Sequence, residues 1–575
     1  MKRLFLILSL LIAVTAQAVT YSGTLPVMFI NTEGNTPITS KEDYLKATYY
    51  IDPMGAEGIE AIGSAEAPLT MQIRGRGNWT WSGFDKKPYR LKLDNKQPLL
   101  GMKKSKHFAL LAHADDNIAF MRNIVGFQLS RLIGLPWTPA DAPVEVVING
   151  EYIGLYFLTE LVRVDKDRVN IVEQPDNATD PETITGGWLV EIDNYDTDPH
   201  IELWEKDSEH SRIVFTYKTP EVLSPEQEAY LTEQMTLIND AIYNPDLEDN
   251  TWEDYVDTDQ LARYYLVQEV LDDYESFHGS CYLYKEQGND KWHFGPVWDF
   301  GNALSCTKYA YIYEGRTWHN TWIGPMCDHP HFMEIVKNVW SEFYNGNFST
   351  IYDYIDDYAA RIAAAAASDA ARWPNYGNAD FDNRVRIAKE RLASGASWLQ
   401  KRWASDVESD TYRAYFVDNE EVKWENVHSF TWYDNEYGQL TNGFGRWPGQ
   451  PMQYDPETGY WYCEFKEEGA LVNPMIIFND GNSGSGHQTE DLVFVDGGLY
   501  DRNGLIGMAV HNTVQQETVR IRVINHQLHV DALEASTIAI VDLTGRISSI
   551  PVGAGSTVLD LRPGFYIVNG RKILL

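Results

Sequence analysis

The chain reads IRGRGNWTWSGFDKKPYRLKL from Ile73 to Leu93. Its last five residues alternate between apolar and basic side chains, which is typical of a β-strand with one buried face. Arg90 and Lys92 then share the outer face, and the glycine-containing turn RGRGN precedes the strand. Backbone N–H groups in such a turn approach phosphate oxygens closely, and cations bind them. The stretch predicts either a phosphate-binding face or an ordinary solvated basic surface.

This stretch opens a basic segment inside an acidic protein. Residues 74–106 contain ten lysines and arginines and two aspartates, a net charge of +8. The whole chain of 575 residues has 47 basic and 83 acidic side chains, which gives −36. Nucleic acid and anionic lipid both require a basic surface, so we expect neither as a partner. A local site for a polyanion such as a nucleoside triphosphate fits these numbers.

Carboxylates gather further along the chain, where a predicted helix ends. Four of them lie within residues 269–275, and Asp299 stands between Trp298 and Phe300. Phosphoryl transfer uses carboxylates to hold Mg²⁺ and orient the attacking hydroxyl, and cations to offset the phosphate charge. The competing interpretations are a helix end with a structural aspartate, and a carboxylate pair for glycoside hydrolysis. A hydrolase would leave the basic segment unexplained.

The pattern of apolar residues predicts an α+β fold for residues 19–404. Strands and turns dominate residues 21–171, with one helix expected over 117–132. From Ser224 the pattern becomes helical, because SPEQ combines an N-cap, a first-turn proline and a capping-box glutamine. Further helices are expected near 257–272, 331–344, 349–372 and 384–404, and a hairpin from SCYLYKE and KWHFGPVWDF.

The first 18 residues, MKRLFLILSLLIAVTAQA, are typical of an export signal that is cleaved after about Ala18. Their apolar stretch of about 11 residues is too short to cross a bilayer. No later segment reaches that length without charge, so we expect an exported protein without a membrane span.

The four cysteines are scattered and form no CxxC pair, which argues against a zinc or redox site. Export would permit one disulfide bridge, and Cys281 with Cys306 is the candidate pair.

The composition and the hydrophobic pattern of the sequence change after Trp403. Residues 410–505 consist of short aromatic strands separated by Gly, Asn, Asp and Pro, which is typical of a β-sandwich. Residues 515–575 alternate strands and turns and predict a further small β domain. The expected organisation is therefore a signal at 1–18 followed by domains at 19–404, 410–505 and 515–575.

Residues 24–404 resemble the CotH-type secreted kinases, the spore-coat protein H family. The resemblance rests on motifs in a fixed order: LPVMFINTEG, IRGRGNWTW with KKPYRLKL, ADDNIAFMRN, YIGLYFLTELVRVDKDRVNI, QEVLDDYESFHGSCYLYKE and GPVWDFGNALS. It implies an atypical protein-kinase-like fold that uses ATP with Mg²⁺ or Mn²⁺. Some members of the family phosphorylate secreted proteins.

The resemblance also implies roles for individual residues. Asp299 matches the metal-binding aspartate of the W-D-[FYL]-[DN] motif. Glu269 matches the acid that opens the E-x-x-x-N-x-D pattern and is a further candidate metal ligand. Glu160 matches an acidic residue that would pair with a cation of the basic segment. The expected phosphate-binding cations are Arg74, Lys87, Arg90 and Lys92.

Two positions depart from the family patterns. The Asn and the catalytic Asp of E-x-x-x-N-x-D fall on Asp273 and Glu275, and the residue after W-D-F is Gly301. Glu275 can still accept a proton as the catalytic base, but its extra methylene moves the carboxylate by about 1 Å. Gly301 offers no ligand, and Asn302 beside it is the candidate replacement. A slow, differently metallated or inactive site would follow from these departures.

Residues 412–500 resemble a starch-binding module of family 26, through TYRAYFVDNEEVKWENVHSFTWYD, RWPGQPM, TGYWYCEF and MIIFNDGNSGSGHQTEDL. Aromatic rings lie flat against the apolar faces of sugars, and amides bind the hydroxyls. The candidates are Tyr415, Trp424 and Trp432 for stacking and Gln488 for the polar contact. Alternatively, Trp432, Trp447 and Trp461 are core aromatic residues of a small sandwich.

The last 60 residues or so, with TIAIVDLTGR and LDLRPGFYIVNGRKILL, resemble the C-terminal sorting domain of the type 9 secretion route. A plain terminal β domain is the alternative. Taken together, the sequence predicts a secreted or cell-surface kinase that transfers phosphate from ATP to an extracellular protein or glycan and is tethered to starch-like polysaccharide. The alternative function is a catalytically inactive surface protein that adheres to carbohydrate.

Overall fold

The computed structural model describes residues 20–509 except 196–197, 205–211, 245, 247–250, 315–321, 377, 404–410, 435–439, 445, 457 and 468–470, and beyond them the strands from Val519 to Leu574. The expected export signal at 1–18 lies outside the described residues. The chain divides into two compact units, Met1–Met508 and Ala509–Leu575.

The first seven strands close into a barrel in the order β1-β2-β3-β4-β5-β7-β6, with β1 and β6 paired in parallel. They are β1 (Val27–Thr32), β2 (Leu45–Asp52), β3 (Leu69–Gly75), β4 (Tyr89–Gln97), β5 (Ser105–Leu111), β6 (Asp141–Ile148) and β7 (Glu151–Glu160). A short helix, α1 (Trp79–Ser82), lies between β3 and β4. As the alternation in β4 predicts, Leu91 and Leu93 are buried in the barrel, and Arg90 and Lys92 lie on its outer face.

The helix expected over 117–132 is present but begins later, as α2 (Met121–Ile133). The two carboxylate oxygens of Asp116 accept hydrogen bonds from the backbone N–H groups of Ile118 at 2.8 Å and Arg122 at 3.0 Å. Phe120, just before the helix, has a left-handed φ of 63°. The aspartate therefore holds residues 117–120 in a turn, which the spacing of apolar residues does not reveal.

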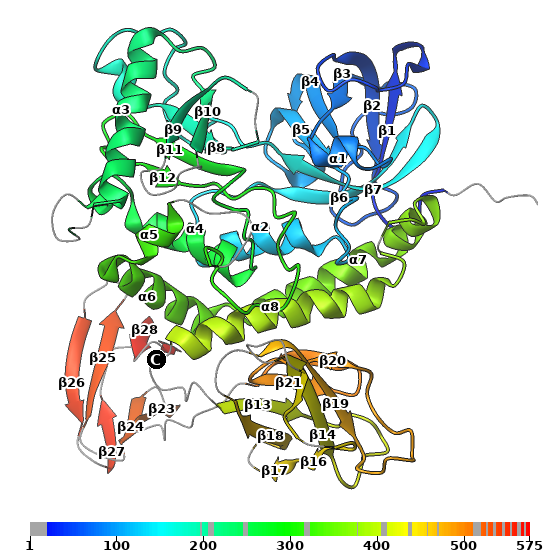
Figure 1. Cartoon of the computed structure of the whole chain (residues 1–575), viewed down its shortest axis with the longest axis vertical. Helices are drawn as coiled ribbons and strands as arrows, with labels where there is room; N and C mark the ends of the chain where they lie inside the picture. The colour runs from blue at the N-terminus through cyan, green and yellow to red at the C-terminus, as the bar shows by residue number, and fades with distance from the viewer. Residues whose placement is uncertain are drawn as a thin grey trace, which may run out of the picture. The chain divides into compact units, whose positions relative to one another are not determined.

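A second lobe follows the barrel and consists of a five-stranded sheet and helices (Figure 1). The sheet order is β12-β11-β8-β10-β9, from β8 (Trp188–Ile192), β9 (His200–Trp204), β10 (Arg212–Thr219), β11 (Cys281–Lys285) and β12 (His293–Phe294). The helices are α3 (Pro225–Ile242), α4 (Thr258–Val270), α5 (Ile323–Cys327), α6 (Pro330–Gly346), α7 (Thr350–Arg372) and α8 (Phe381–Trp403). The predicted capping box of α3 and the β11–β12 hairpin are both confirmed.

A buried ion pair fixes the barrel to α7. Lys86, between α1 and β4, is 1% exposed, and its Nζ lies 2.7 Å from Oδ1 of Asp369 on α7. The same oxygen accepts the backbone N–H of Leu155 in β7 at 2.8 Å. Residue 154 must be glycine, because it has a φ of +113° and a Cβ there would lie 2.3 Å from Asp369 Oδ1. The barrel and α7 therefore meet at a contact that requires the Lys86–Asp369 ion pair and leaves no room for a side chain at residue 154.

A β-sandwich follows α8, in agreement with the aromatic strand pattern. One sheet has the order β17-β18-β13-β21-β22 and the other β15-β14-β19-β20, with β16 also paired to β14. The strands are β13 (Thr411–Phe416), β14 (His428–Asp434), β15 (Leu440–Asn442), β16 (Gln450–Pro451), β17 (Gln453–Asp455), β18 (Tyr460–Lys466), β19 (Val472–Asn479), β20 (Leu492–Val493), β21 (Gly498–Asp501) and β22 (Gly504–Met508). The sandwich contacts α8 through β20 and β22.

The second unit contains two small sheets, β23-β24-β27 and β26-β25-β28-β29. Its strands are β23 (Val519–Ile524), β24 (Gln527–Ala532), β25 (Ser536–Asp542), β26 (Ile547–Val552), β27 (Gly555–Leu559), β28 (Phe565–Val568) and β29 (Arg571–Leu574). The fold as a whole is α+β, with a bilobal domain, a β-sandwich and a terminal β unit.

The proposed bridge between Cys281 and Cys306 was wrong. None of the four cysteines, all of which lie in the described residues, forms a disulfide bridge. Cys281 lies buried in β11, whereas the Cys306 thiol lies 3.5 Å from Asp272 Oδ2. Within the described residues, no helix is both long and apolar enough to cross a membrane.

Candidate active site

Asp299 is the predicted metal ligand, and the backbone presents its carboxylate outward. The residue has a left-handed φ of 60° and is exposed, whereas its neighbours Trp298 and Phe300 are buried. Phe300 packs so closely on α2 that a Cβ at Gly126 would lie 2.4 Å from its ring. Its backbone N–H also donates to Asn123 Oδ1 at 3.2 Å. Helix α2 therefore anchors the apolar residue next to Asp299 and holds the carboxylate in place.

Arg76 is the cation that faces Asp299, and sequence reasoning did not single it out. It lies at the turn after β3, and its guanidinium is 5.8 Å from the ring centre of Trp298. Although the Asp299 side chain is accessible, the protein atoms around it desolvate the carboxylate and raise its pKa, and the positive charge of Arg76 lowers this pKa in part. Arg76 follows the expected Arg74 by two residues, so strand alternation could have suggested that both share one face.

Two further carboxylates lie near Asp299, in the turn after α4. Glu275 is partly exposed; burial raises its pKa, the side chain of Tyr195 donates a hydrogen bond that lowers it, and the charge of Asp299 raises it. Asp273 is 1% exposed, and its Oδ1 has no hydrogen-bond partner. Burial raises the pKa of Asp273 well above its usual range, and repulsion from Glu275 and Asp299 adds to this. The structure thus brings Glu275 and Asp299 together, as the sequence predicts.

Glu269, the other expected metal ligand, makes a different contact. It is fully buried at the end of α4, where it forms an ion pair with Lys308. The same ammonium lies 3.2 Å from Asp272 Oδ1, and Ile312 N–H donates to Glu269 at 3.3 Å. Lys308 therefore supplies the positive charge that this carboxylate requires, and the pair stabilises the end of the helix.

Asn302, proposed as the replacement ligand beside Gly301, is partly exposed and accepts a hydrogen bond from the Tyr274 hydroxyl at 3.2 Å. The backbone carbonyl of Gly301 accepts a hydrogen bond from Arg122 Nη1 at 2.7 Å. The loop after Asp299 is therefore held by polar contacts from both α2 and the turn after α4.

The four expected phosphate-binding cations divide into two groups. Lys87 Nζ donates to the carbonyl of Trp81 at 2.6 Å, and Arg74 donates to the carbonyl of Lys41. Both side chains therefore already donate to backbone carbonyls of the protein, although the Nε of Arg74 is buried without a hydrogen-bond partner, as is that of Arg90. On the outer face of β4, the Nε of Arg90 is buried without a hydrogen-bond partner.

Arg90 is surrounded by other basic side chains at one end of the barrel. Its charge contributes to the lowered pKa values of Arg76, Arg163 and His107, although burial is the largest cause for each. Lys92, opposite His107 in the β4–β5 register, lies over the ring of Tyr44 at 5.9 Å. A group of positive charges with an unpaired N–H is suited to bind an anion such as a phosphate.

Glu160 does not pair with the basic segment, so the expected partner was wrong. Its Oε1 accepts a hydrogen bond from Arg168 Nη2 at 2.7 Å, and its Oε2 accepts the backbone N–H of Ala140 at 3.1 Å. Both Glu160 and Arg168 are almost fully buried. The local sequence LTELVRVDKDR contains three arginines and lysines after Glu160, and the chain returns to place Arg168 against it.

The residues near Asp299 suit a hard divalent cation. Within the described parts of the chain, no three His, Cys, Asp or Glu side chains are close enough to hold a metal by themselves. Mg²⁺ in nucleotide sites needs only one or two protein carboxylates, because phosphates and water complete its octahedron. The exposed carboxylate of Asp299 and the unpartnered Oδ1 of buried Asp273 are oxygen ligands of this kind.

Comparison with protein families agrees with this geometry. Residues 73–399, more than half of the chain, match the family model described as CotH kinase protein. The chain belongs to this family. The matched region of the CotH domain runs from β3 to α8 and so includes Arg76, Glu275 and Asp299. No curated protein matches the chain.

A second match covers residues 414–494, which fit the model of starch-binding module 26. In this β-sandwich after the CotH domain, Tyr415 is 6% exposed. Trp424 is stacked on Phe416 at 5.6 Å, and the guanidinium of Arg502 lies over its ring at 4.4 Å. Tyr415 and Trp424, two of the three expected stacking residues, are therefore covered by other side chains of the protein.

Trp432 and Gln488 are more accessible to a ligand. Trp432 is partly exposed on the outer face of β14, where its ring lies 5.7 Å from that of Phe430. Phe430 in turn meets the exposed Trp447 at 5.8 Å. The sequence suggested Trp447 only under the alternative that it is a core residue of the sandwich, and the alternation of β14 could have placed Phe430 and Trp432 together.

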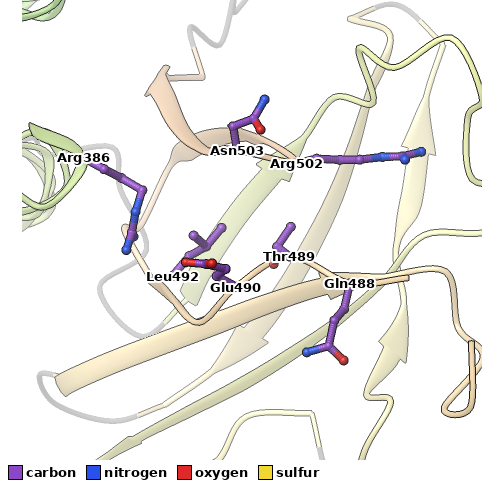
Figure 2. Close-up of a pocket in the computed structure, with 7 residues that line it drawn as sticks. All are labelled: Arg386, Gln488, Thr489, Glu490, Leu492, Arg502 and Asn503. Atoms are coloured by element: carbon purple, nitrogen blue, oxygen red, sulfur yellow. The ribbon is translucent and has the colours of Figure 1, made fainter. Parts of the chain in front are cut away.

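Gln488 is exposed and lines a polar pocket between α8 and the sandwich (Figure 2). The lining residues are Arg386, Gln488, Thr489, Glu490, Leu492, Arg502 and Asn503. No aromatic ring lines this pocket, so Gln488 and Trp432 do not form one stacking site there.

Proposed function

We propose that this CotH-family protein transfers the γ-phosphoryl group of ATP to a hydroxyl of an extracellular protein or glycan, with Mg²⁺ or Mn²⁺. The observation that carries the proposal is the convergence of Asp299, Glu275 and Arg76, which come from separate segments of the two lobes. A carboxylate for the metal, a second one for the acceptor and a cation for the phosphates are the parts that this reaction requires.

Each side chain has a distinct role in this mechanism. Asp299 holds the divalent ion, which when bound neutralises charge on the phosphate oxygens. Arg76 and Arg90 bind phosphate oxygens from the barrel side. Glu275 orients the acceptor hydroxyl and takes its proton, a role favoured by the raised pKa of its carboxyl group.

The test is transfer of labelled γ-phosphate from ATP by the full-length protein. The reaction is run with Mg²⁺ and Mn²⁺ on the protein itself and on a secreted fraction. Label that depends on the metal and is lost in Asp299→Ala supports the proposal. Equal labelling by both proteins, or none by a folded wild type, contradicts it.

A catalytically inactive adhesion protein is the second candidate. Glu275 and Gly301 depart from the family patterns at the site, whereas the aromatic group Phe430, Trp432 and Trp447 is reachable on the module. Binding of the full-length protein to insoluble starch tests this function separately. We expect Trp432→Ala to weaken starch binding and leave phosphoryl transfer unchanged, and Asp299→Ala to do the reverse.

The sequence features at the two ends support a place outside the cell. Residues 1–18 have the order of an export signal, and residues 515–575 resemble a sorting domain of the type 9 route. We propose that the protein is exported and reaches the cell surface or medium. Mass spectrometry of the mature N-terminus, with cleavage expected after about Ala18, checks the first step.

A further inference from the structure

Gly301 occupies the position where the CotH pattern has a carboxylate or an amide side chain. The carboxylates of Asp299 and Asp115 border the space that such a side chain would fill. A Cβ at residue 301 would lie 3.5 Å from Asp299 Oδ1 and 3.8 Å from Asp115 Oδ2. Both distances are ordinary van der Waals contacts, and residue 301 has no left-handed φ. The space next to Asp299 is thus reached by a side chain from the β5–α2 loop.

Asp115 is held there by the surrounding backbone. Arg122 on α2 donates through Nη1 to the carbonyl of Gly301 at 2.7 Å and to that of Asp115 at 3.5 Å. Asn378 fixes the same loop, because it accepts the N–H of Ala119 at 2.9 Å and donates to the carbonyl of Asp116 at 2.8 Å. The position of the Asp115 carboxylate beside Asp299 is therefore built into the lobe junction.

A second observation indicates that a cation belongs here. Asp273 is 1% exposed and faces the charges of Asp299 and Glu275, yet its Oδ1 has no hydrogen-bond partner. Partly buried carboxylates that repel one another are stabilised when a divalent ion lies between them.

We propose that Asp115 is the second carboxylate ligand of the divalent metal and takes the place that Gly301 leaves without a side chain. The inference rests on the proposed function, because it concerns the metal of the same site. It makes the Gly301 departure compatible with metal binding, since one or two protein carboxylates suffice for Mg²⁺ with a nucleotide.

The experiment measures Mn²⁺ binding directly by the electron paramagnetic resonance signal of free Mn²⁺, with a non-hydrolysable ATP analogue present. We expect Asp115→Asn to raise the Kd for Mn²⁺ by roughly ten-fold or more. In the double variant Asp115→Asn/Gly301→Asp, the new carboxylate is expected to restore Mn²⁺ binding. Asp380→Asn, on an exposed loop, is the matched control and should bind Mn²⁺ as the wild type does.

The outcomes separate this inference from the proposed function. If the wild type and Asp115→Asn bind Mn²⁺ equally well, the role of Asp115 is overturned and the metal-dependent function stands. If the affinity falls and Gly301→Asp does not restore it, Asp115 maintains the loop and is not a ligand. If the wild type binds no Mn²⁺, both ideas fail. Thermal unfolding of each variant shows that the comparison is made between folded proteins.

Discussion

At the scale of single residues, Glu275 decides whether the site is a working kinase. Its carboxylate lies near Asp299 and is held by the hydrogen bond from Tyr195. Removal of a positioned proton acceptor typically lowers a rate by about 10²–10⁴-fold. We expect Glu275→Gln to lower kcat by this order and to leave Mn²⁺ binding and the unfolding temperature close to those of the wild type.

Steady-state phosphoryl transfer with saturating ATP measures this effect. Tyr195→Phe is the matched control, because it removes the hydrogen bond and keeps the carboxylate, so its loss in kcat should be smaller. An unchanged kcat in Glu275→Gln would show that another group takes the proton.

The candidate site residues whose position the sequence indicates best are those whose motif fixes their backbone. Asp299 is recognisable because Trp298 and Phe300 must be buried and so turn the acid outward. The partners of Glu160 and Glu269 were not predictable, because Arg168 and Lys308 reach them through loops whose path the sequence pattern does not give. Arg76 and Asp115 were missed for the same reason: their roles depend on how two lobes meet.

At the scale of elements, the basic side chains of strand β4 and of the segment before it differ in their contacts, and these contacts rank them as candidate phosphate ligands. The Arg90 Nε is buried without a partner, whereas Lys87 Nζ already donates to the Trp81 carbonyl. We expect Arg90→Ala to raise the KM for ATP on the order of ten-fold, since charge-assisted hydrogen bonds to phosphate would be lost. Lys87→Ala should leave this KM nearly unchanged. The opposite ranking of the two variants would reassign the phosphate-binding face.

Helix α8 contains a titratable group that makes stability depend on pH. Glu390 is fully buried and pairs with Arg386 Nη1 at 2.6 Å, and burial raises its pKa from 4.5 to about 7. The folded state therefore binds this proton more tightly than the unfolded state does. Because of this, the contribution of Glu390 to the free energy of unfolding falls as pH rises from about 4.5 to 7.

Glu390→Gln removes this dependence. We expect the free energy of unfolding of the variant, relative to the wild type, to increase between about pH 4.5 and pH 7 by up to about 1.4 kcal/mol per pH unit and to level off above this range. Urea unfolding at several pH values measures the difference. Lys389→Gln, which removes the neighbouring ion pair with the exposed Asp356, is the control and should show a much smaller change. A difference that stays constant with pH would contradict the raised pKa.

At the scale of the whole molecule, the CotH domain and the starch-binding module share a core. Residues of α8 such as Leu392 and Leu399 and residues of the sandwich such as Tyr412 and Phe478 belong to one buried apolar cluster. The clustering of contacts likewise places both in the unit Met1–Met508. The sequence predicts two separate domains, because each part of the chain has its own motifs. The contacts between the two parts involve residues far apart in the chain, and no local sequence pattern reveals them.

Lys401 at the end of α8 joins the two parts. It is 8% exposed, its Nζ donates to the Thr411 carbonyl at 2.6 Å, and the ammonium lies 3.2 Å from Asp496 Oδ2. Its charge partly offsets the effect of burial, which raises the pKa of Asp496. Lys401→Met keeps the apolar stem and removes the charge, so it leaves Asp496 without this partner. The expected loss is about 3 kcal/mol in the free energy of unfolding.

The shared core determines how this loss is distributed. If the unit unfolds cooperatively, starch binding and phosphoryl transfer should disappear at the same urea concentration, and Lys401→Met should lower both midpoints equally. The exposed Lys423→Met is the matched control and should shift neither. If the module instead kept binding starch at urea concentrations that abolish transfer, it would be an independently folding tether. Equal shifts would mean that phosphoryl transfer and starch binding depend on one cooperatively folded unit.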